Sequence, residues 1–185
     1  MGADIAAPSV RMFVGIKVAP DIAEELARLV KPLEGLPVRL IPPADLHLTF
    51  VPPWNETDVP AAAERLRKAA CALRAFTLTF ARLAYGPTRR RPRLLWAECV
   101  ATAEVTNMHA LLLAAFGQED GRPFRPHVTL ARLEGNGRTI ADAHPFNQIL
   151  SLTQRVNAIE LFRSPAKGEK GYEAPVSVPL GCALA

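Results

Sequence analysis

Prolines divide this chain into short segments, and they limit the fold more than any other feature of the sequence. The chain has 185 residues, of which 17 are prolines scattered along its length. A proline lacks the backbone N–H that a helix interior or a central strand needs, so helices and strands tend to end near these positions. The segments between the prolines are short and apolar, which predicts many small strands and a few helices.

The segments follow two different periodicities. Apolar side chains recur every three or four residues in three segments, which predicts helices at 20–34, 58–73 and 102–116. Alternating or β-rich segments predict strands at 11–18, 38–41, 46–51, 76–80, 93–100, 127–133, 156–162 and 172–180. The last segment contains Pro175 and Pro179 and is typical of an edge strand. Half-buried strands with intervening helices favour an α+β fold with antiparallel sheets over a doubly wound parallel sheet.

The composition excludes several classes of protein. With 49% hydrophobic and 22% charged residues, the chain can form a core and is not disordered throughout. A net charge of +4 permits an anionic ligand but is low for a protein that coats DNA. Cys71, Cys99 and Cys182 form no CxxC pair, so neither a structural zinc site nor a disulfide scaffold is expected. We see no signal peptide or membrane-spanning run and expect a cytoplasmic protein, with a disordered tail at 1–10.

One tetrapeptide pattern occurs twice. The sequence His47-Leu48-Thr49-Phe50 is matched by His127-Val128-Thr129-Leu130, and each copy follows a loop that contains proline. Side chains two residues apart on a strand point to the same side. In each copy, an imidazole and a hydroxyl therefore share one face, and two apolar side chains share the other. If the two strands meet, one cleft holds two histidines and two threonines.

Such a cleft suits attack at phosphorus. Histidine titrates near neutral pH, so one neutral ring can act as a base while a protonated ring acts as an acid. Threonine hydroxyls can donate hydrogen bonds to the non-bridging oxygens of a phosphodiester. The chain has no HExxH motif, and two histidines alone make a poor zinc site, so we expect no metal and no other cofactor.

These motifs and their flanks resemble the 2H phosphoesterase superfamily, and within it the RNA 2′,3′-cyclic phosphodiesterases, also called 2′-5′ RNA ligases. The resemblance begins at Arg11 and includes RMFVGIKV, PPADLHLTF, RRRPRLLWAE, RPFRPHVTLAR and IELFRS. It implies a single bilobal domain over 11–185, in which two antiparallel sheets face each other across a central groove with helices outside. It also implies hydrolysis of 2′,3′-cyclic phosphate ends of RNA or nucleotides to 2′-phosphates, and the reverse joining of RNA ends without ATP.

The resemblance assigns roles to individual residues of this chain. It makes His47 and His127 the catalytic pair, and it makes Thr49 and Thr129 phosphate ligands. For a 2′-phosphate product the 3′ oxygen leaves, and our working assignment gives His47 the acid role and His127 the base role. The sequence does not separate these two roles. Arg132 lies five residues after the second histidine, where the family favours an arginine that would contact RNA phosphate.

Two of the assigned positions need explanation. Strict alternation would put Arg132 on the opposite face from His127, so its role requires a twist or a strand end; a surface ion pair with Glu134 is the alternative. Pro52 stands where relatives usually have a phenylalanine that can stack on a base. Trp54 would replace that phenylalanine or would simply pack in the core.

Three hypotheses about the function therefore remain. The first is the cyclic phosphodiesterase, which we expect to act as a monomer on an RNA 3′ end or a cyclic nucleotide. The second is an RNA- or nucleotide-binding module without turnover. The third is a hydrolase of another cyclic or 2′-5′-linked nucleotide. The basic run of arginines at 89–93 would line a route for RNA or form a solvated loop, and we expect His109 to be structural.

Overall fold

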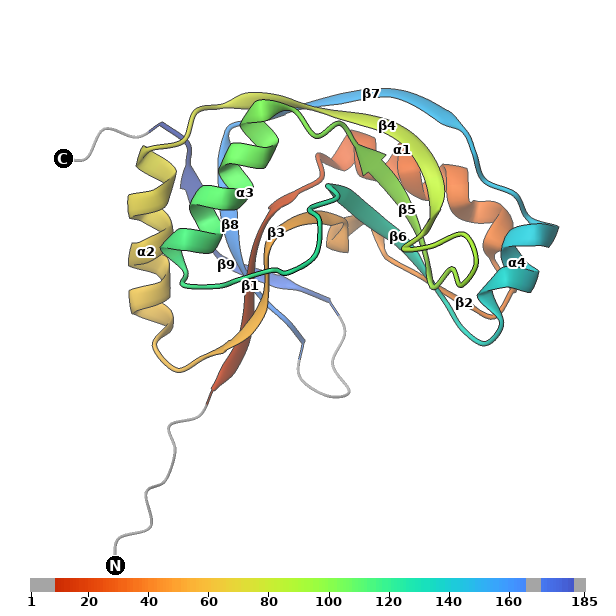
Figure 1. Cartoon of the computed structure of the whole chain (residues 1–185), viewed down its shortest axis with the longest axis horizontal. Coiled ribbons are helices and arrows are strands. Elements are labelled where there is room, and N and C mark those ends of the chain that lie inside the picture. Colours follow the sequence, from red (N-terminus) through yellow and green to blue (C-terminus); the bar gives the residue numbers. More distant parts are fainter. Residues whose placement is uncertain (1–8, 166–170, 182–185) are drawn as a thin grey trace, which may run out of the picture.

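The computed structural model describes residues 9–165 and 171–181, and it combines a curled sheet with outer helices (Figure 1). The strands are β1 (Val10–Lys17), β2 (Val38–Leu40), β3 (His47–Glu56), β4 (Phe76–Gly86), β5 (Leu94–Cys99), β6 (His127–Leu133), β7 (Ile149–Val156), β8 (Ala158–Arg163) and β9 (Glu173–Pro179). The α-helices are α1 (Pro20–Val30), α2 (Val59–Cys71), α3 (Ala103–Ala115) and α4 (Gly137–Ala143), and the short 3₁₀ helices are η1 (Lys31–Leu33) and η2 (Pro43–Asp45).

The strands form two halves that meet in the middle of one curled sheet. In the described part of the chain the order is β7-β4-β5-β6-β3-β1-β8-β9, and β2 also pairs with β6. We call β3, β1, β8 and β9 the β1 half, and β6, β5, β4, β7 and β2 the β5 half. All recorded pairings are antiparallel, and β9 lies at an edge as its two prolines predict. The expected α+β fold is confirmed.

The two halves are joined by very little backbone pairing. Among the described residues, β3 and β6 are joined by one facing pair, Leu48 with Val128. Neighbouring pairs of strands have longer registers, such as the pairing of β1 with β3 from Val10 to Lys17. The two halves therefore meet along a narrow seam, and both copies of the repeated motif lie on it.

The helices cover the outer faces of the two halves and bury their apolar stripes. In Figure 1, α2 and α3 lie on one side of the sheet, whereas α1 and α4 lie near the other end. The Asp58 carboxylate caps α2 by accepting a hydrogen bond from the Ala61 N–H at 2.9 Å, and Thr102 caps α3 in the same way. None of the described helices is long and apolar enough to span a membrane.

The structure corrects several strand and helix boundaries. The strand expected to stop at Val51 continues through Pro52 and Pro53 to Glu56, because register shifts against β1 place both prolines in an irregular stretch that needs fewer N–H donors. Strand β7 and helix α4 were not predicted: β7 is an edge strand with little burial, and α4 has seven residues. Strand β1 begins at Val10, inside the tail expected at 1–10; residues 1–8 and Cys182 lie outside the described residues.

Candidate active site

The seam between the two halves brings the two motifs together. Because Leu48 faces Val128 across β3 and β6, the antiparallel register places His47 opposite Thr129 and Thr49 opposite His127. Leu48 and Val128 are fully buried in the core. The two imidazoles and two hydroxyls therefore lie on the other face as a two-by-two array, and all four side chains are half-buried.

Both histidines are held in the same tautomer. His47 Nδ1 lies 2.7 Å from the carbonyl oxygen of Asp45, and His127 Nδ1 lies 2.7 Å from the carbonyl oxygen of Arg125. A carbonyl oxygen only accepts hydrogen bonds, so Nδ1 carries the hydrogen in both rings. In the neutral form, each ring then keeps a lone pair on Nε2, which is the atom that can exchange a proton with a ligand.

Aromatic rings hold His47 in place. Its ring centroid lies 4.8 Å from that of Phe13, 5.4 Å from that of Phe162 and 4.8 Å from that of Tyr172. The Tyr172 ring meets His47 edge-on, and the backbone N–H of Tyr172 donates a hydrogen bond of 3.0 Å to the Asp45 carboxylate. Asp45 therefore orients His47 through its carbonyl group and fixes Tyr172 beside it through its side chain.

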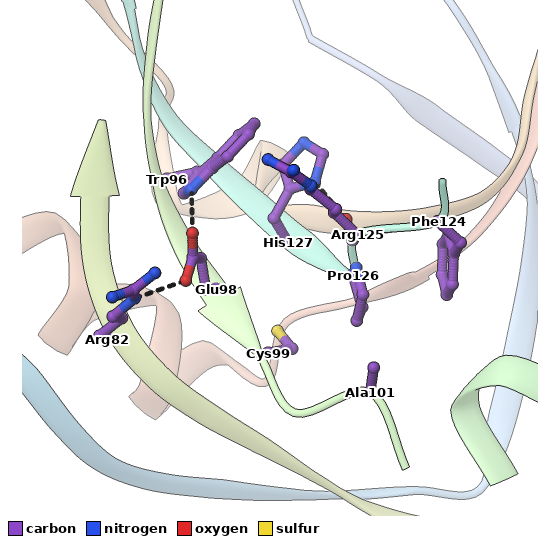
Figure 2. Close-up of a pocket in the computed structure, with 9 residues that line it drawn as sticks. All are labelled: Arg82, Trp96, Glu98, Cys99, Ala101, Phe124, Arg125, Pro126 and His127. Carbon is purple, nitrogen blue, oxygen red and sulfur yellow. Dashed lines mark hydrogen bonds and ion pairs between the residues drawn. The ribbon is translucent and has the colours of Figure 1, made fainter. Parts of the chain in front are cut away.

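The surroundings of His127 are more polar. The Trp96 ring centroid lies 4.3 Å from that of His127, and Glu98 faces His127 directly across β5 and β6. The Glu98 carboxylate accepts hydrogen bonds from Trp96 Nε1 at 3.2 Å and from Arg82 Nε at 2.6 Å. Figure 2 shows Arg82, Glu98 and Trp96 in a connected line beside His127. A carboxylate in this position stabilises positive charge on His127.

The environments shift the pKa values of both histidines. Burial lowers the pKa of His47, the hydrogen bond to Asp45 opposes this, and the positive charge of Arg132 adds to the lowering. Burial also lowers the pKa of His127, whereas the Arg125 carbonyl and the negative charge of Glu98 oppose that change. Glu98 thus favours a proton on His127. His47 lies near charges of both signs, because Asp45 favours a proton on its ring whereas Arg132 disfavours one.

A β-bulge explains how Arg132 reaches the face of the two histidines. In the pairing of β5 with β6, Trp96 faces Thr129 but the next partner of β6 is Ala131, so Leu130 is an extra residue. Leu130 and Ala131 are consecutive and both buried, and Arg132 is exposed. The bulge reverses the alternation after Thr129 and puts Arg132 on the same face as His127. This is the twist that the sequence analysis required.

Trp54 lies apart from the array. It pairs across the strands with Met12, which is buried under the helices, and its ring centroid is 5.0 Å from that of Phe116 at the end of α3. Its indole N–H donates to the Glu56 carboxylate at 3.1 Å. These contacts give Trp54 a packing role on the helix-covered face, which was the alternative named for it.

His109 also lies outside the array. Its Nδ1 is 2.8 Å from the Phe50 carbonyl oxygen, and its ring stacks on Phe124 with centroids 3.8 Å apart. The residue links α3 to β3, in agreement with the structural role expected for it.

Sequence reasoning missed three residues of this site: Asp45, Glu98 and Tyr172. Asp45 lies two residues before the first motif, so its proximity to His47 was a usable signal. Glu98 and Tyr172 are far from both motifs in sequence, and only the pairing of strands brings them close. In the described part of the chain, no group of three His, Cys, Asp or Glu side chains is arranged to hold a metal ion.

Known proteins resemble this chain over most of its length. A model of the 2′-5′ RNA ligase superfamily matches residues 18–167, which include both motifs. An RNA 2′,3′-cyclic phosphodiesterase of Bacillus subtilis is 28% identical over 128 residues, which are 65% of this chain and 69% of that protein.

Two solved structures have the same fold. The crystal structure of TT0787 of Thermus thermophilus superposes with a TM-score of 0.74 at 22% identity, over 92% of this chain and 98% of that one. The crystal structure of Escherichia coli LigT complexed with 3′-AMP gives a TM-score of 0.72 at 23% identity, over 94% of this chain and 99% of that one.

Proposed function

The chain belongs to the 2′-5′ RNA ligase superfamily, and we propose that it hydrolyses 2′,3′-cyclic phosphate ends of RNA or nucleotides to 2′-phosphates. The observation that carries this proposal is the two-by-two array of His47, Thr49, His127 and Thr129 across one pair of strands. The name of the Bacillus subtilis relative, RNA 2′,3′-cyclic phosphodiesterase, supports the substrate class.

The array suits a phosphate held between two proton carriers. The cyclic phosphate would lie between the rings, with Thr49 and Thr129 donating hydrogen bonds to its non-bridging oxygens. Arg132, which the bulge turns to this face, would add a positive charge near the phosphate or the RNA backbone. In-line attack then places the incoming water near one histidine and the departing 3′ oxygen near the other.

The Glu98 charge beside His127 supports our working assignment of the two histidines. When His127 takes a proton from water, its ring becomes positive beside the Glu98 carboxylate, which is favourable. When His47 gives its proton to the 3′ oxygen, the loss of positive charge relieves repulsion from Arg132 but also removes the attraction of the Asp45 charge. The interaction of His127 with Glu98 is therefore the one that grows stronger on the way to the transition state. The bound phosphate anion would favour the protonated form of His47 before the reaction.

The reaction is tested by hydrolysis of a nucleoside 2′,3′-cyclic phosphate in the presence of EDTA. We expect the wild-type protein to hydrolyse this substrate. His47→Ala and His127→Ala should each lower kcat by about 10²–10⁴-fold. The double variant should be little worse than either single variant, because the two rings act as a unit. His144→Ala is the matched control, since His144 lies at the end of α4 outside the array. Full activity in either single variant contradicts the two-imidazole mechanism.

The same assay distinguishes the three functional hypotheses. Tight binding of an RNA 3′ end by wild type without product indicates a binding module. Faster turnover of another cyclic or 2′-5′-linked nucleotide in a substrate panel indicates that this nucleotide is the substrate, which is the third hypothesis. Loss of wild-type activity in EDTA, restored by added metal, contradicts metal independence.

A sulfur-substituted substrate tests which histidine is the acid. When the 3′ leaving oxygen is replaced by sulfur, the thiolate departs without needing a proton. We expect His47→Ala to regain most of its activity on this substrate and His127→Ala to regain little. The reverse pattern assigns the acid role to His127.

A further inference from the structure

Two arginines face each other across β2 and β6, beside the array. Arg39 in β2 is the partner of Arg132 in β6, and both residues are exposed. Facing residues of neighbouring strands point to the same side of the sheet, so Arg39 shares the face that the bulge at Leu130 gives to Arg132. Figure 1 shows β2 next to β6, on the side of β6 that also pairs with β3.

Apolar neighbours confirm the direction of the Arg39 side chain. Val38 and Leu40 are half-buried and pack against the core, whereas Arg39 between them is exposed. Side chains alternate along a strand, so Arg39 points away from the core. The face that carries the two motifs therefore also carries two guanidinium groups.

Neither guanidinium group has an acidic partner within the described part of the chain. The ion pairs recorded there include neither Arg39 nor Arg132, so the pair with Glu134 that was the alternative for Arg132 is not formed. Like charges on residues that face each other across two strands are destabilising. An anion bound between the two groups would remove this repulsion, so the position favours a negatively charged ligand.

The distance from the array selects one phosphate of a nucleotide chain. Thr129 faces Trp96, and Arg132 faces Leu94, which lies two residues earlier in β5. At a rise of about 3.4 Å per residue, the two positions are about 7 Å apart along the strand. Successive phosphates of an RNA chain have a similar separation. With the cyclic phosphate at Thr129, the next phosphate of the chain therefore reaches the two arginines.

The proposed mechanism puts the nucleotide on this side of the array. In-line displacement places the leaving 3′ oxygen opposite the attacking water, and our working assignment places that oxygen beside His47. The ribose that carries it then lies on the His47 side of phosphorus. The register sets His47 opposite Thr129, which is nearer to Arg132 than His127 is. The positive charge of Arg132 contributes to the lowered pKa of His47, in agreement with this placement.

We propose that Arg39 and Arg132 together bind the 5′-phosphate of the nucleotide that carries the cyclic phosphate. The inference rests on the proposed function, because it uses the same bound cyclic phosphate and the same role of His47. Guanidinium groups bind phosphate through paired, charge-assisted hydrogen bonds. The site would then contact both phosphates of one nucleotide, and it would favour an RNA end or a 5′-phosphorylated nucleotide over a cyclic nucleotide with a free 5′-hydroxyl.

The test compares two substrates that differ only in this phosphate. Hydrolysis of adenosine 2′,3′-cyclic phosphate and of its 5′-phosphorylated form is measured separately, and the two kcat/KM values give a preference ratio. The wild-type protein should favour the 5′-phosphorylated substrate by about tenfold, as expected for a hydrogen bond between charged groups. A loss of catalysis that is common to both substrates leaves the ratio unchanged.

Arg39→Ala should abolish most of this preference, and Arg39→Lys, which keeps the charge but not the planar group, should give an intermediate ratio. Arg93→Ala is the matched control, because it removes the same charge close by. Arg93 is exposed and precedes Leu94, which faces Arg132, so alternation places Arg93 on the opposite side of the sheet. This variant should keep the wild-type ratio. Added salt should lower the ratio of the wild-type protein more than that of Arg39→Ala.

The other outcomes separate this inference from the proposed function. A wild-type protein that hydrolyses neither substrate contradicts the proposed function itself. Equal kcat/KM values for the two substrates, or equal falls in the ratio for Arg39→Ala and Arg93→Ala, overturn the inference and leave the proposed function standing. Arg125 is exposed and lines the pocket beside His127 (Figure 2). If Arg125→Ala abolishes the preference and Arg39→Ala does not, the 5′-phosphate lies on the His127 side, which also overturns the inference.

Discussion

Gly15→Ala should damage both the stability of the protein and its proposed active site. Gly15 is buried in the middle of β1, between Thr49 of β3 and Glu160 of β8. A Cβ atom at this position would overlap the backbone carbonyl oxygen of Leu48 and would lie 3.5 Å from the Phe162 ring. The carbonyl belongs to a central strand and cannot rotate away, so β1 and β3 must separate.

The size of the effect follows from these contacts. Overpacking of a core typically costs about 1–3 kcal/mol, and for a chain of this length each kcal/mol lowers the Tm by about 2–4 °C. We therefore expect the Tm to fall by about 2–12 °C. Leu48 lies between His47 and Thr49, so its displacement also moves the array. A shift of about 1 Å costs up to about 10²-fold in kcat.

The measurement compares thermal unfolding and cyclic-phosphate turnover of Gly15→Ala with those of Gly121→Ala. Gly121 is exposed and has no atom within 4 Å of its added Cβ, so that variant should resemble wild type. Equal Tm values and equal rates of cyclic-phosphate hydrolysis for the two variants would contradict this reasoning. The close approach of β1 to β3 would then not require a glycine at position 15.

Four further predictions concern pH, positioning and helix capping. The kcat/KM profile should be bell-shaped with its maximum below pH ~6.5, because burial lowers the pKa of both His47 and His127. Glu98→Gln removes a charge that raises the pKa of His127, so it should move the acidic limb of this profile to lower pH; movement of the alkaline limb instead would make His127 the acid. Asp45→Ala should lower kcat with little change in global stability, because Tyr172 loses its anchor beside the first histidine; restored turnover in Asp45→Asn would support a positioning role. Asp58→Ala should destabilise the protein by about 1 kcal/mol in denaturant unfolding without changing KM, because only the cap of α2 is lost.

The strands that carry the motifs were predictable because their signals are local. The strand at 127–133 has the predicted bounds, and the capping roles of Asp58 and Thr102 follow from their positions before apolar helical repeats. The meeting of His47 and His127 in one site was also predictable as a hypothesis, since two copies of one His-x-Thr pattern suggested a common site. Each of these inferences needs only a few neighbouring residues.

The features that the sequence did not reveal depend on register between distant strands. The bulge at Leu130, which brings Arg132 to the face of the histidines, is a property of how β6 pairs with β5. The same pairing brings Glu98 to His127. The sequence leaves Trp54 two roles, stacking on a base in place of the missing phenylalanine or packing in the core. The irregular pairing of β3 with β1 turns it toward Phe116. Single-sequence patterns contain no information about such partners.

The narrow seam between β3 and β6 gives a bound substrate a mechanical role. The backbone contributes few hydrogen bonds between these two strands, so the sheet is weakest along the line where the phosphate would lie. A phosphate held by side chains from both strands acts as a cross-link between the two halves. Occupancy of the site should then suppress opening of the sheet, and amide hydrogens near the seam should exchange more slowly in the ligand-bound protein.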